Sequence, residues 1–337
     1  MGSLESDHTD PLSTEFVYCN GAITEVLKYG SCKTRHDTLI LVIPGNPGVV
    51  GFYTTFMQTL HQAFNYRVPV WAVSHAGHCE PPDHMDMVED SSLAAELDVF
   101  GINGQIEHKL TFLRKHVPRE THLVLIGHSI GCYIILEMMK RNPELKVLKA
   151  VMLFPTIERM AQTPQGRVVT PVICQLRYVA YFPVFLLSLL PESLKHGLVR
   201  LAVYIYSRLS PLSNFRTHCA NAMYMGGQEM KKVLDRDNAT IKKHLHKLIF
   251  YYGAADHWCP VEYYNDIKRD FPDGDFRLCE SQQSPLISSS SHLFFLSSLL
   301  SRVFFLSSFS PLSRLLFLSS LALPLVPSWC YGRHKSP

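Results

Sequence analysis

The stretch that decides the fold is residues 122–131, which read His-Leu-Val-Leu-Ile-Gly-His-Ser-Ile-Gly. Its first five residues form a short apolar run, typical of a strand that is buried on both faces. The run continues into a Gly-x-Ser-x-Gly motif at 127–131, and a helix-compatible segment, 130–141, follows. In this motif the serine stands on a turn so tight that bulky side chains two residues away on either side would collide. We therefore predict that Ser129 is a nucleophile held above the end of a sheet.

Further strands and helices alternate on both sides of this motif. Apolar runs of strand length occupy 38–43, 68–73, 150–154, 248–252 and 276–279, and helical spacing occupies 106–115 and 261–270. Strands that alternate with helices predict a parallel sheet covered on both faces. The sequence therefore predicts the α/β class, with a mostly parallel sheet.

The loop after the first of these strands is expected to bind the oxyanion of an acyl-transfer reaction. Residues 44–48 read Pro-Gly-Asn-Pro-Gly. In this architecture the donors are the N–H after the nucleophile and one N–H from this loop. Those donors would be Ile130 and Asn46, because Pro47 has no N–H. The alternative is a Pro-Gly turn that binds no ligand.

A serine hydroxyl becomes nucleophilic when a histidine takes its proton and an acid orients that histidine. Asp256 follows the strand at 248–252 and suits the chain order serine, acid, histidine. The histidine is expected just after the strand at 276–279, where His292 is the only nearby candidate and no glycine or turn fixes it. The base is therefore unassigned, with His292 as a possible substitute.

Residues 156–245 hold Pro-punctuated apolar stretches without a convincing strand, and they predict an inserted helical cap. Within it, 178–190 is uncharged and 198–205 carries a single arginine. Both stretches fall short of the roughly 20 residues that span a bilayer. Either they dip into a lipid monolayer from the cytosolic side, or they line a pocket. The expected division is a core of 1–155 and 246–280, with the cap between.

Composition narrows the function further. Of the 337 residues, 18% are charged, against about 25% in typical domains, which predicts an apolar, lipid-facing area of surface. The nine scattered cysteines favour a reduced, cytosol-facing protein, and the acidic start of the chain does not resemble a signal peptide. The charge balance does not favour nucleic-acid binding, and no phosphate-binding loop or metal-ligand cluster predicts a cofactor.

Residues 281–337 differ from the rest of the chain. Of these 57 residues, 17 are serine, 13 leucine and 6 phenylalanine, and none is acidic. Codons made only of pyrimidines encode serine, leucine, phenylalanine and proline. We interpret this tail as an alternative or intronic translation of a pyrimidine-rich tract.

These motifs together resemble the lipid droplet-associated hydrolase family, a branch of the α/β-hydrolase fold. The resemblance covers about residues 15–280 and is carried in order by 43–48, 74–78, 103–109, 126–131, 153–160 and 251–260. It implies a serine hydrolase of lipid droplets and endoplasmic reticulum, with sterol esters as substrate and an apolar mid-chain membrane anchor. It also implies Ser129 as nucleophile and Asp256 as acid.

The resemblance does not supply a base. Members of the family place a histidine shortly after the segment matching 277–280 and then close the domain with a helix, and the divergent tail replaces both. Our hypothesis is that this chain is an inactive or nearly inactive variant of a lipid ester hydrolase. The alternatives are a lipid-binding scaffold without catalysis, and a thioesterase or acyltransferase using the same serine. Epoxide and haloalkane hydrolases are disfavoured because they need a carboxylate at position 129.

Overall fold

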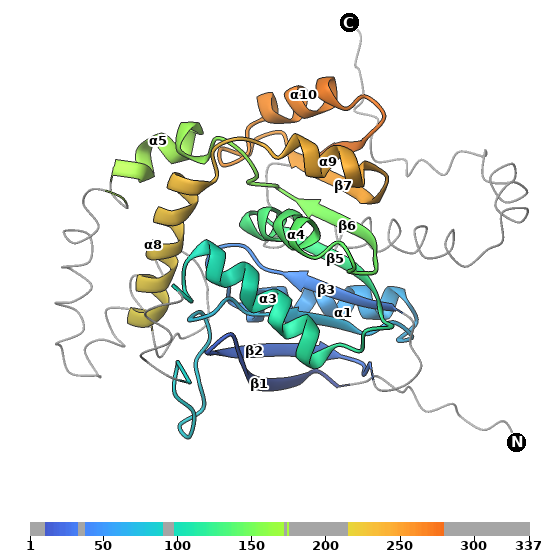
Figure 1. Ribbon diagram of the computed structural model, residues 1–337, viewed down its shortest axis with the longest axis vertical. Coiled ribbons are helices and arrows are strands. Elements are labelled where there is room, and N and C mark those ends of the chain that lie inside the picture. The colour runs from blue at the N-terminus through green and yellow to red at the C-terminus, as the bar shows by residue number, and fades with distance from the viewer. Residues whose placement is uncertain (1–10, 33–37, 90–97, 172–173, 175–214, 280–337) are drawn as a thin grey trace, which may run out of the picture.

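The computed structural model describes residues 11–32, 38–89, 98–171, 174 and 215–279, and its centre is one eight-stranded sheet (Figure 1). Its strands are β1 (Ser13–Cys19), β2 (Ala22–Tyr29), β3 (Thr38–Ile43), β4 (Val70–Val73), β5 (His122–His128), β6 (Val147–Leu153), β7 (Leu248–Gly253) and β8 (Asp275–Cys279). The strand order is β1-β2-β4-β3-β5-β6-β7-β8. The strands from β4 to β8 in this order pair in parallel, whereas β1 and β2 are antiparallel to their neighbours. The predicted mostly parallel sheet is confirmed.

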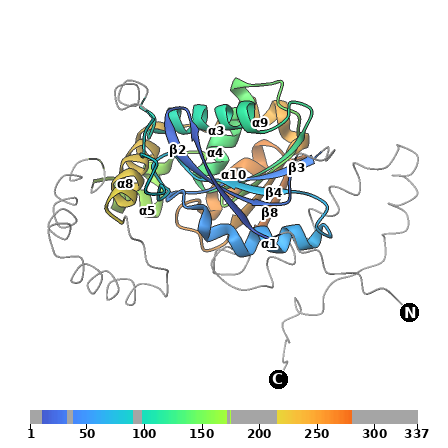
Figure 2. The same ribbon diagram turned by 90° about the horizontal axis from the view of Figure 1, so that it is seen from below.

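Helices cover both faces of this sheet. They are η1 (Val50–Tyr53), α1 (Thr54–Ala63), α3 (Ile102–His116), α4 (Ile130–Arg141), η2 (Met160–Gln162), α5 (Pro164–Thr170), α8 (Phe215–Lys232), α9 (Asn238–His244), η4 (Leu245–Lys247) and α10 (Val261–Asp270). Figure 2 shows α3, α4 and α9 on one side of the sheet and α1 on the other. The central strands β3, β4 and β5 are therefore almost wholly buried, which explains their continuous apolar runs.

The sequence patterns locate the parallel strands well but miss the first hairpin. Strands β1 and β2 form an antiparallel edge joined at Asn20 and Gly21, which have φ of 52° and 78°. An Asn-Gly pair is the usual two-residue hairpin turn, because both positions need a positive φ. That dipeptide could have revealed the hairpin. The exposed and partly buried residues of β1 give no continuous apolar run.

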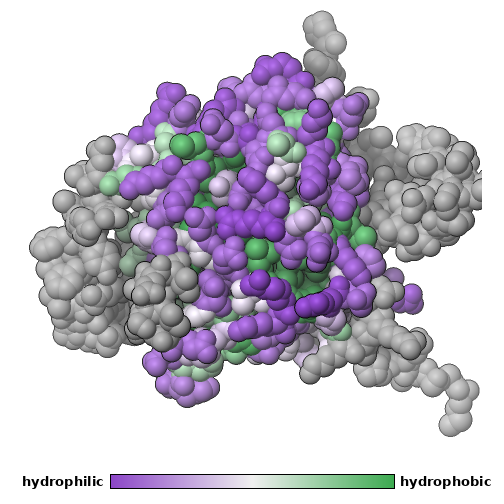
Figure 3. Space-filling model, viewed as in Figure 1, coloured by the Kyte–Doolittle hydropathy of each residue, from purple (hydrophilic) through white to green (hydrophobic). Residues whose placement is uncertain are grey.

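The described part of the predicted cap, within 156–245, is helical and contains no strand. Figure 1 shows α8 running along one end of the sheet, with α5 beside it. The apolar stretches 178–190 and 198–205 lie outside the described residues, as do the tail 281–337 and His292. No helix within the described part of the chain is long and apolar enough to cross a membrane. The face of the molecule in Figure 3 is largely hydrophilic, with smaller apolar areas between polar side chains.

Candidate functional site

Ser129 occupies the turn between β5 and α4. Its φ of 53° and ψ of −121° lie outside the conformations that a serine ordinarily adopts. Such a backbone persists only where the surrounding structure enforces it, and residues of this kind concentrate at functional sites. The residue is partly buried, and it directly follows the last residue of β5, at the carboxyl end of the parallel strands.

The two glycines of the motif allow this turn. A Cβ atom at Gly131 would lie 2.3 Å from the carbonyl oxygen of Ile43, and one at Gly127 would lie 2.8 Å from the amide nitrogen of Cys132. Both obstacles are backbone atoms, which cannot rotate away. The turn therefore requires the two glycines that the sequence places there.

Neighbouring strands hold Ser129 by hydrogen bonds. Its N–H donates to the carbonyl oxygen of Leu153, at the end of β6, over 2.9 Å. Its hydroxyl lies 3.3 Å from the hydroxyl of the buried Thr156. Thr156 was not singled out in the sequence, although its place just after β6, next to β5 in the sheet, could have indicated it. The hydroxyl of Thr156 can orient the serine hydroxyl while the site is empty.

The loop after β3 packs against this serine. An ideal Cβ on Gly45 would lie 3.2 Å from the Cβ of Ser129, so the backbone of the loop contacts the nucleophile closely. The N–H of Gly45 is already used, because it donates to the hydroxyl of Tyr53 over 2.9 Å. Within the described residues the N–H of Asn46 has no hydrogen-bond partner. The N–H of Ile130, the first residue of α4, has no acceptor within its own helix.

His128 lies next to the nucleophile in the sequence but is poorly suited to serve as its base. Its Nδ1 lies 2.9 Å from the hydroxyl of Tyr53. That hydroxyl accepts from Gly45, so its own hydrogen is free to be donated to the imidazole. Burial lowers the pKa of His128 to about 4, although the nearby Asp256 carboxylate opposes the shift. An imidazole with so low a pKa accepts a proton reluctantly at neutral pH.

Asp256 lies in the loop after β7, two strands from β5 at the same end of the sheet. One carboxylate oxygen accepts the N–H groups of Trp258 and Cys259, over 2.7 and 3.2 Å. The other accepts the thiol of Cys259 over 3.0 Å. Since Asp256 also shifts the pKa of His128, the acid and the nucleophile turn are close enough to interact electrostatically. Asp256 does not cap α10, whose N-cap is Pro260.

Among the described residues, no histidine forms a hydrogen bond with the side chain of Ser129 or of Asp256. His257, beside Asp256, is exposed, and His292 lies outside the described residues. The base is thus still unassigned.

His75 and His78 follow β4, and both side chains are fully buried. The N–H of Gly48 donates to Nδ1 of His78 over 2.9 Å, which connects the loop after β4 to the loop after β3. Behind them, the ammonium of Lys109 on α3 donates to the carbonyl oxygen of Ser74 over 2.7 Å. These side chains form a buried polar layer that supports the two loops. Among the residues that the structure describes, no three His, Cys, Asp or Glu side chains are grouped to hold a metal ion.

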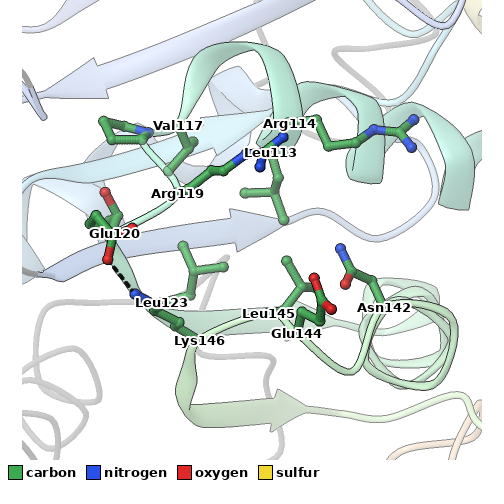
Figure 4. Close-up of a pocket in the computed structure, with 12 residues that line it drawn as sticks. Leu113, Arg114, Val117, Arg119, Glu120, Leu123, Asn142, Glu144, Leu145 and Lys146 are labelled. Carbon is green, nitrogen blue, oxygen red and sulfur yellow. Dashed lines mark hydrogen bonds and ion pairs between the residues drawn. The ribbon is translucent and has the colours of Figure 1, made fainter.

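A separate hollow of about 440 Å³ opens at the other end of the sheet (Figure 4). Leu113 of α3 and Leu123 at the start of β5 line it, together with Leu145 just before β6. At its rim, Lys146 and Glu120 form an ion pair over 2.6 Å. Because Ser129 follows the last residue of β5, this hollow is not part of the candidate site.

Comparison with known families gives a match over most of the chain. The profile of a family described as lipid-droplet associated hydrolase matches residues 36–285. The chain is 54% identical over 290 residues to a lipid droplet-associated hydrolase of Gallus gallus, covering 82% of this chain and 90% of that one. It is 50% identical over 286 residues to the protein of that name in Homo sapiens, with 80% and 88% covered.

Solved structures share the fold at low sequence identity. A serine hydrolase from a polyaromatic hydrocarbon-degrading Cycloclasticus bacterium superposes with a TM-score of 0.58 at 12% identity, covering 89% of this chain and all of that one. A bacterial membrane phospholipase A superposes with a TM-score of 0.53 at 16% identity, with 87% and 86% covered. The expected α/β-hydrolase fold is confirmed, and these distant likenesses support the fold alone.

Proposed function

Because the chain belongs to the family of lipid-droplet-associated hydrolases, we propose that it cleaves lipid esters at the surface of lipid droplets through an acyl intermediate on Ser129. The observation that carries this proposal is the backbone of Ser129, with φ of 53° between a buried strand and a helix. A serine that merely connected β5 to α4 would not need this conformation, nor two glycines where no Cβ fits.

In the proposed reaction the oxygen of Ser129 attacks the ester carbonyl carbon and its proton passes to a base. The carbonyl oxygen becomes an oxyanion, which the N–H groups of Asn46 and Ile130 stabilise. The alcohol then leaves with a proton, and water releases the fatty acid from the serine. Asp256 would orient the base and stabilise its positive charge. Sterol esters are the proposed substrates, in keeping with the family resemblance.

We further propose that this chain turns over slowly, because the family histidine is not matched in its sequence. Without a base, the serine hydroxyl keeps its ordinary high pKa and the rate falls by several orders of magnitude. Imidazole in solution can then take the place of the missing side chain.

Labelling by a fluorophosphonate, together with hydrolysis of a short p-nitrophenyl ester, tests both statements. We expect slow labelling at Ser129 that imidazole accelerates and that Ser129→Ala abolishes. Asp256→Asn removes the carboxylate charge with little change of shape and should reduce the reaction that depends on imidazole, because Asp256 would orient the imidazole that acts as base. Robust turnover without imidazole that His292→Ala abolishes would refute the slow-turnover proposal and assign the base to His292. If no reaction depends on Ser129, even with imidazole present, the proposal that this chain is a serine hydrolase is refuted.

A scaffold that binds lipid without catalysis is the second candidate, favoured because the histidine beside Ser129 in the described part of the chain, His128, is poorly suited to act as the base. The two candidates differ in cells, because replacing Ser129 by alanine should change lipid storage only if the serine reacts. The proposed location is the lipid droplet and the cytosolic face of the endoplasmic reticulum. Deleting residues 172–206 should release the protein from droplets if this segment is the membrane anchor.

A further inference from the structure

Helix α8 from the predicted cap contacts both loops at the carboxyl end of the central strands. The side-chain amide of Asn221 donates to the carbonyl oxygen of Gly77, after β4, over 2.8 Å. The side-chain amide of Asn46, after β3, donates to the carbonyl oxygen of Ala222 over 2.9 Å. Figure 1 shows α8 lying across this end of the sheet. One helix therefore holds the loop that carries the proposed oxyanion donor.

Glu229 makes the second contact with that loop. It follows Ala222 by seven residues, which is two helical turns, so both face Asn46 from the same side of α8. Its Oε1 accepts a hydrogen bond from the Asn46 amide over 3.0 Å. The two hydrogens of that amide are thereby both used.

The orientation of the Asn46 amide follows from its partners. The carbonyl of Ala222 can only accept, so the nitrogen and not the oxygen must face it. Its amide oxygen is left buried, without a hydrogen-bond partner among the described residues. The amide plane is thus fixed by α8 alone.

Burial of the Glu229 carboxyl group is unfavourable for the free energy of folding. Its exposed fraction is 5%, and within the described chain no ion pair reaches it. Burial raises its pKa to about 7, although the hydrogen bond from Asn46 opposes the shift. A buried carboxyl group without a cation usually destabilises a fold relative to an apolar side chain of similar size. We therefore expect Glu229 to contribute to the position of the loop at 44–48 rather than to the stability of the fold.

Among the hydrogen bonds that the structure describes for this loop, those at Gly45 and Gly48 come from the hydrolase core and those of the Asn46 side chain come from the cap. Gly45 is held by the hydroxyl of Tyr53, and Gly48 is held by the ring of His78. Asn46, between them, is held by α8. Loss of the middle attachment would free the Asn46 backbone to rotate between two fixed neighbours.

We propose that Glu229 is a positioning residue, which holds the side chain of Asn46 so that its backbone N–H points at the developing oxyanion on the substrate. The inference rests on the proposed function, because it takes the N–H of Asn46 as an oxyanion donor. It adds a coupling between the cap and the reaction centre, in which α8 sets the geometry of the loop. Glu229 itself does not touch the reacting atoms.

Hydrogen exchange measured by mass spectrometry on the full chain tests whether Glu229 holds the loop. Glu229→Leu removes the acceptor, and we expect about tenfold faster exchange at the hydrogen-bonded amides of Gly45 and Gly48, on either side of Asn46 and Pro47. Glu229→Gln keeps an acceptor oxygen in place and should leave exchange within about twofold of the wild type. Gln228→Leu alters the preceding residue of α8, whose side-chain amide donates to the hydroxyl of Tyr224 and not to Asn46, and serves as the matched control. Unchanged exchange in Glu229→Leu would overturn the inference, whether or not the chain is an enzyme.

Turnover of the short ester, with imidazole present, tests whether the held loop serves the reaction. We expect Glu229→Leu to lower kcat by about 10- to 100-fold with KM within about threefold, since small misplacements of a catalytic group cost up to about 100-fold. Glu229→Gln should retain activity within about threefold. Asn46→Ala should match Glu229→Leu, and the double variant should lose little more, because the two side chains act as one unit.

The two measurements separate the possible failures. Faster exchange in Glu229→Leu with unchanged kcat would overturn the role in the reaction. If the wild-type chain shows no turnover that depends on Ser129, the proposed function fails, while the exchange experiment still decides whether Glu229 positions the loop.

Discussion

Replacement of Lys109 by methionine gives a quantitative test of the buried polar layer behind the candidate site. Lys109 is fully buried on α3, and its ammonium contacts the carbonyl oxygen of Ser74 and Nδ1 of His108, over 2.7 and 2.9 Å. Burial lowers its pKa from 10.5 to about 7, although the nearby thiols of Cys19 and Cys79 oppose the shift. In the unfolded chain the same group should titrate near its ordinary pKa.

The sign of the effect follows from the number of protons bound in each state. Between pH 7 and 10.5 the unfolded chain keeps the proton on Lys109 and the folded chain has lost it, so stability rises with pH. The slope approaches about 1.4 kcal/mol per pH unit, and the gain from pH 7 to pH 9 is about 2 kcal/mol. Below pH 7 Lys109 is protonated in both the folded and the unfolded chain, so its titration no longer changes the free energy of unfolding.

In the folded chain, burial moves the pKa values of the other buried groups near Lys109 away from this interval. Burial lowers the pKa of His75 and His108 well below the ordinary value, so both stay neutral. Burial raises the pKa of Cys79 to about 11 and also raises the pKa of Cys19, so both stay thiols. Titration of these groups in the unfolded chain is common to the wild type and to Lys109→Met, so it cancels in the difference between the two proteins, which reports the proton on Lys109.

Urea unfolding of the wild type and Lys109→Met at pH 7, 8 and 9, followed by circular dichroism, measures this difference. The hydrogen bonds lost with the amine shift the stability of the variant at every pH, whereas the proton effect changes with pH. We expect the wild type to gain about 2 kcal/mol relative to the variant from pH 7 to 9. Lys115→Met, on the exposed end of the same helix, controls for the change in net charge. A difference that stays constant within about 0.5 kcal/mol over this range would refute the reasoning, since it would show no differential protonation.

Three further substitutions test the packing around the site. Gly131→Ala forces a Cβ to within 2.3 Å of a backbone oxygen, so it should lower the unfolding free energy by at least about 2 kcal/mol and suppress fluorophosphonate labelling. Gly51→Ala is the control, because a Cβ at Gly51 meets open space and should change neither quantity. Tyr53→Phe removes the hydroxyl that accepts a backbone N–H after β3, and urea unfolding should show a loss of about 1–3 kcal/mol. Arg236→Met leaves the buried carboxylate of Glu158 with one fewer partner, and the same measurement should show a loss of about 2 kcal/mol, which an unchanged unfolding midpoint would contradict.

Local patterns predicted the parallel part of the fold closely. Helices α4 and α10 begin and end at the residues that the sequence indicated, and β7 differs by a single residue. Buried parallel strands are short apolar runs bounded by glycine and proline, so their pattern is strong within a few residues. The edge hairpin was missed because β1 is mostly exposed or partly buried, and because β2, although largely buried, mixes polar and charged residues with apolar ones.

The contacts that complete the candidate site could not be predicted in the same way. The hydroxyl of Thr156 reaches Ser129 because β5 and β6 are neighbours in the sheet. The carboxyl of Glu229 reaches Asn46 across 183 residues of sequence. Neither contact follows from a motif or a spacing alone: the position of Thr156 just after β6 becomes informative only once β5 and β6 are known to be neighbours, and nothing in the sequence links Glu229 to Asn46.

The sequence by itself predicted that Ser129 stands on a tight turn at the end of a buried strand, since an apolar run, two glycines and a helical segment within twenty residues are typical of that arrangement. Only the tertiary structure decided what surrounds that serine: a loop fastened to α8, a tyrosine bound to His128, and a carboxylate from beyond β7. The physical reason is that local conformation depends on nearest neighbours along the chain, whereas these contacts depend on strand order and helix packing, which join segments far apart in the sequence.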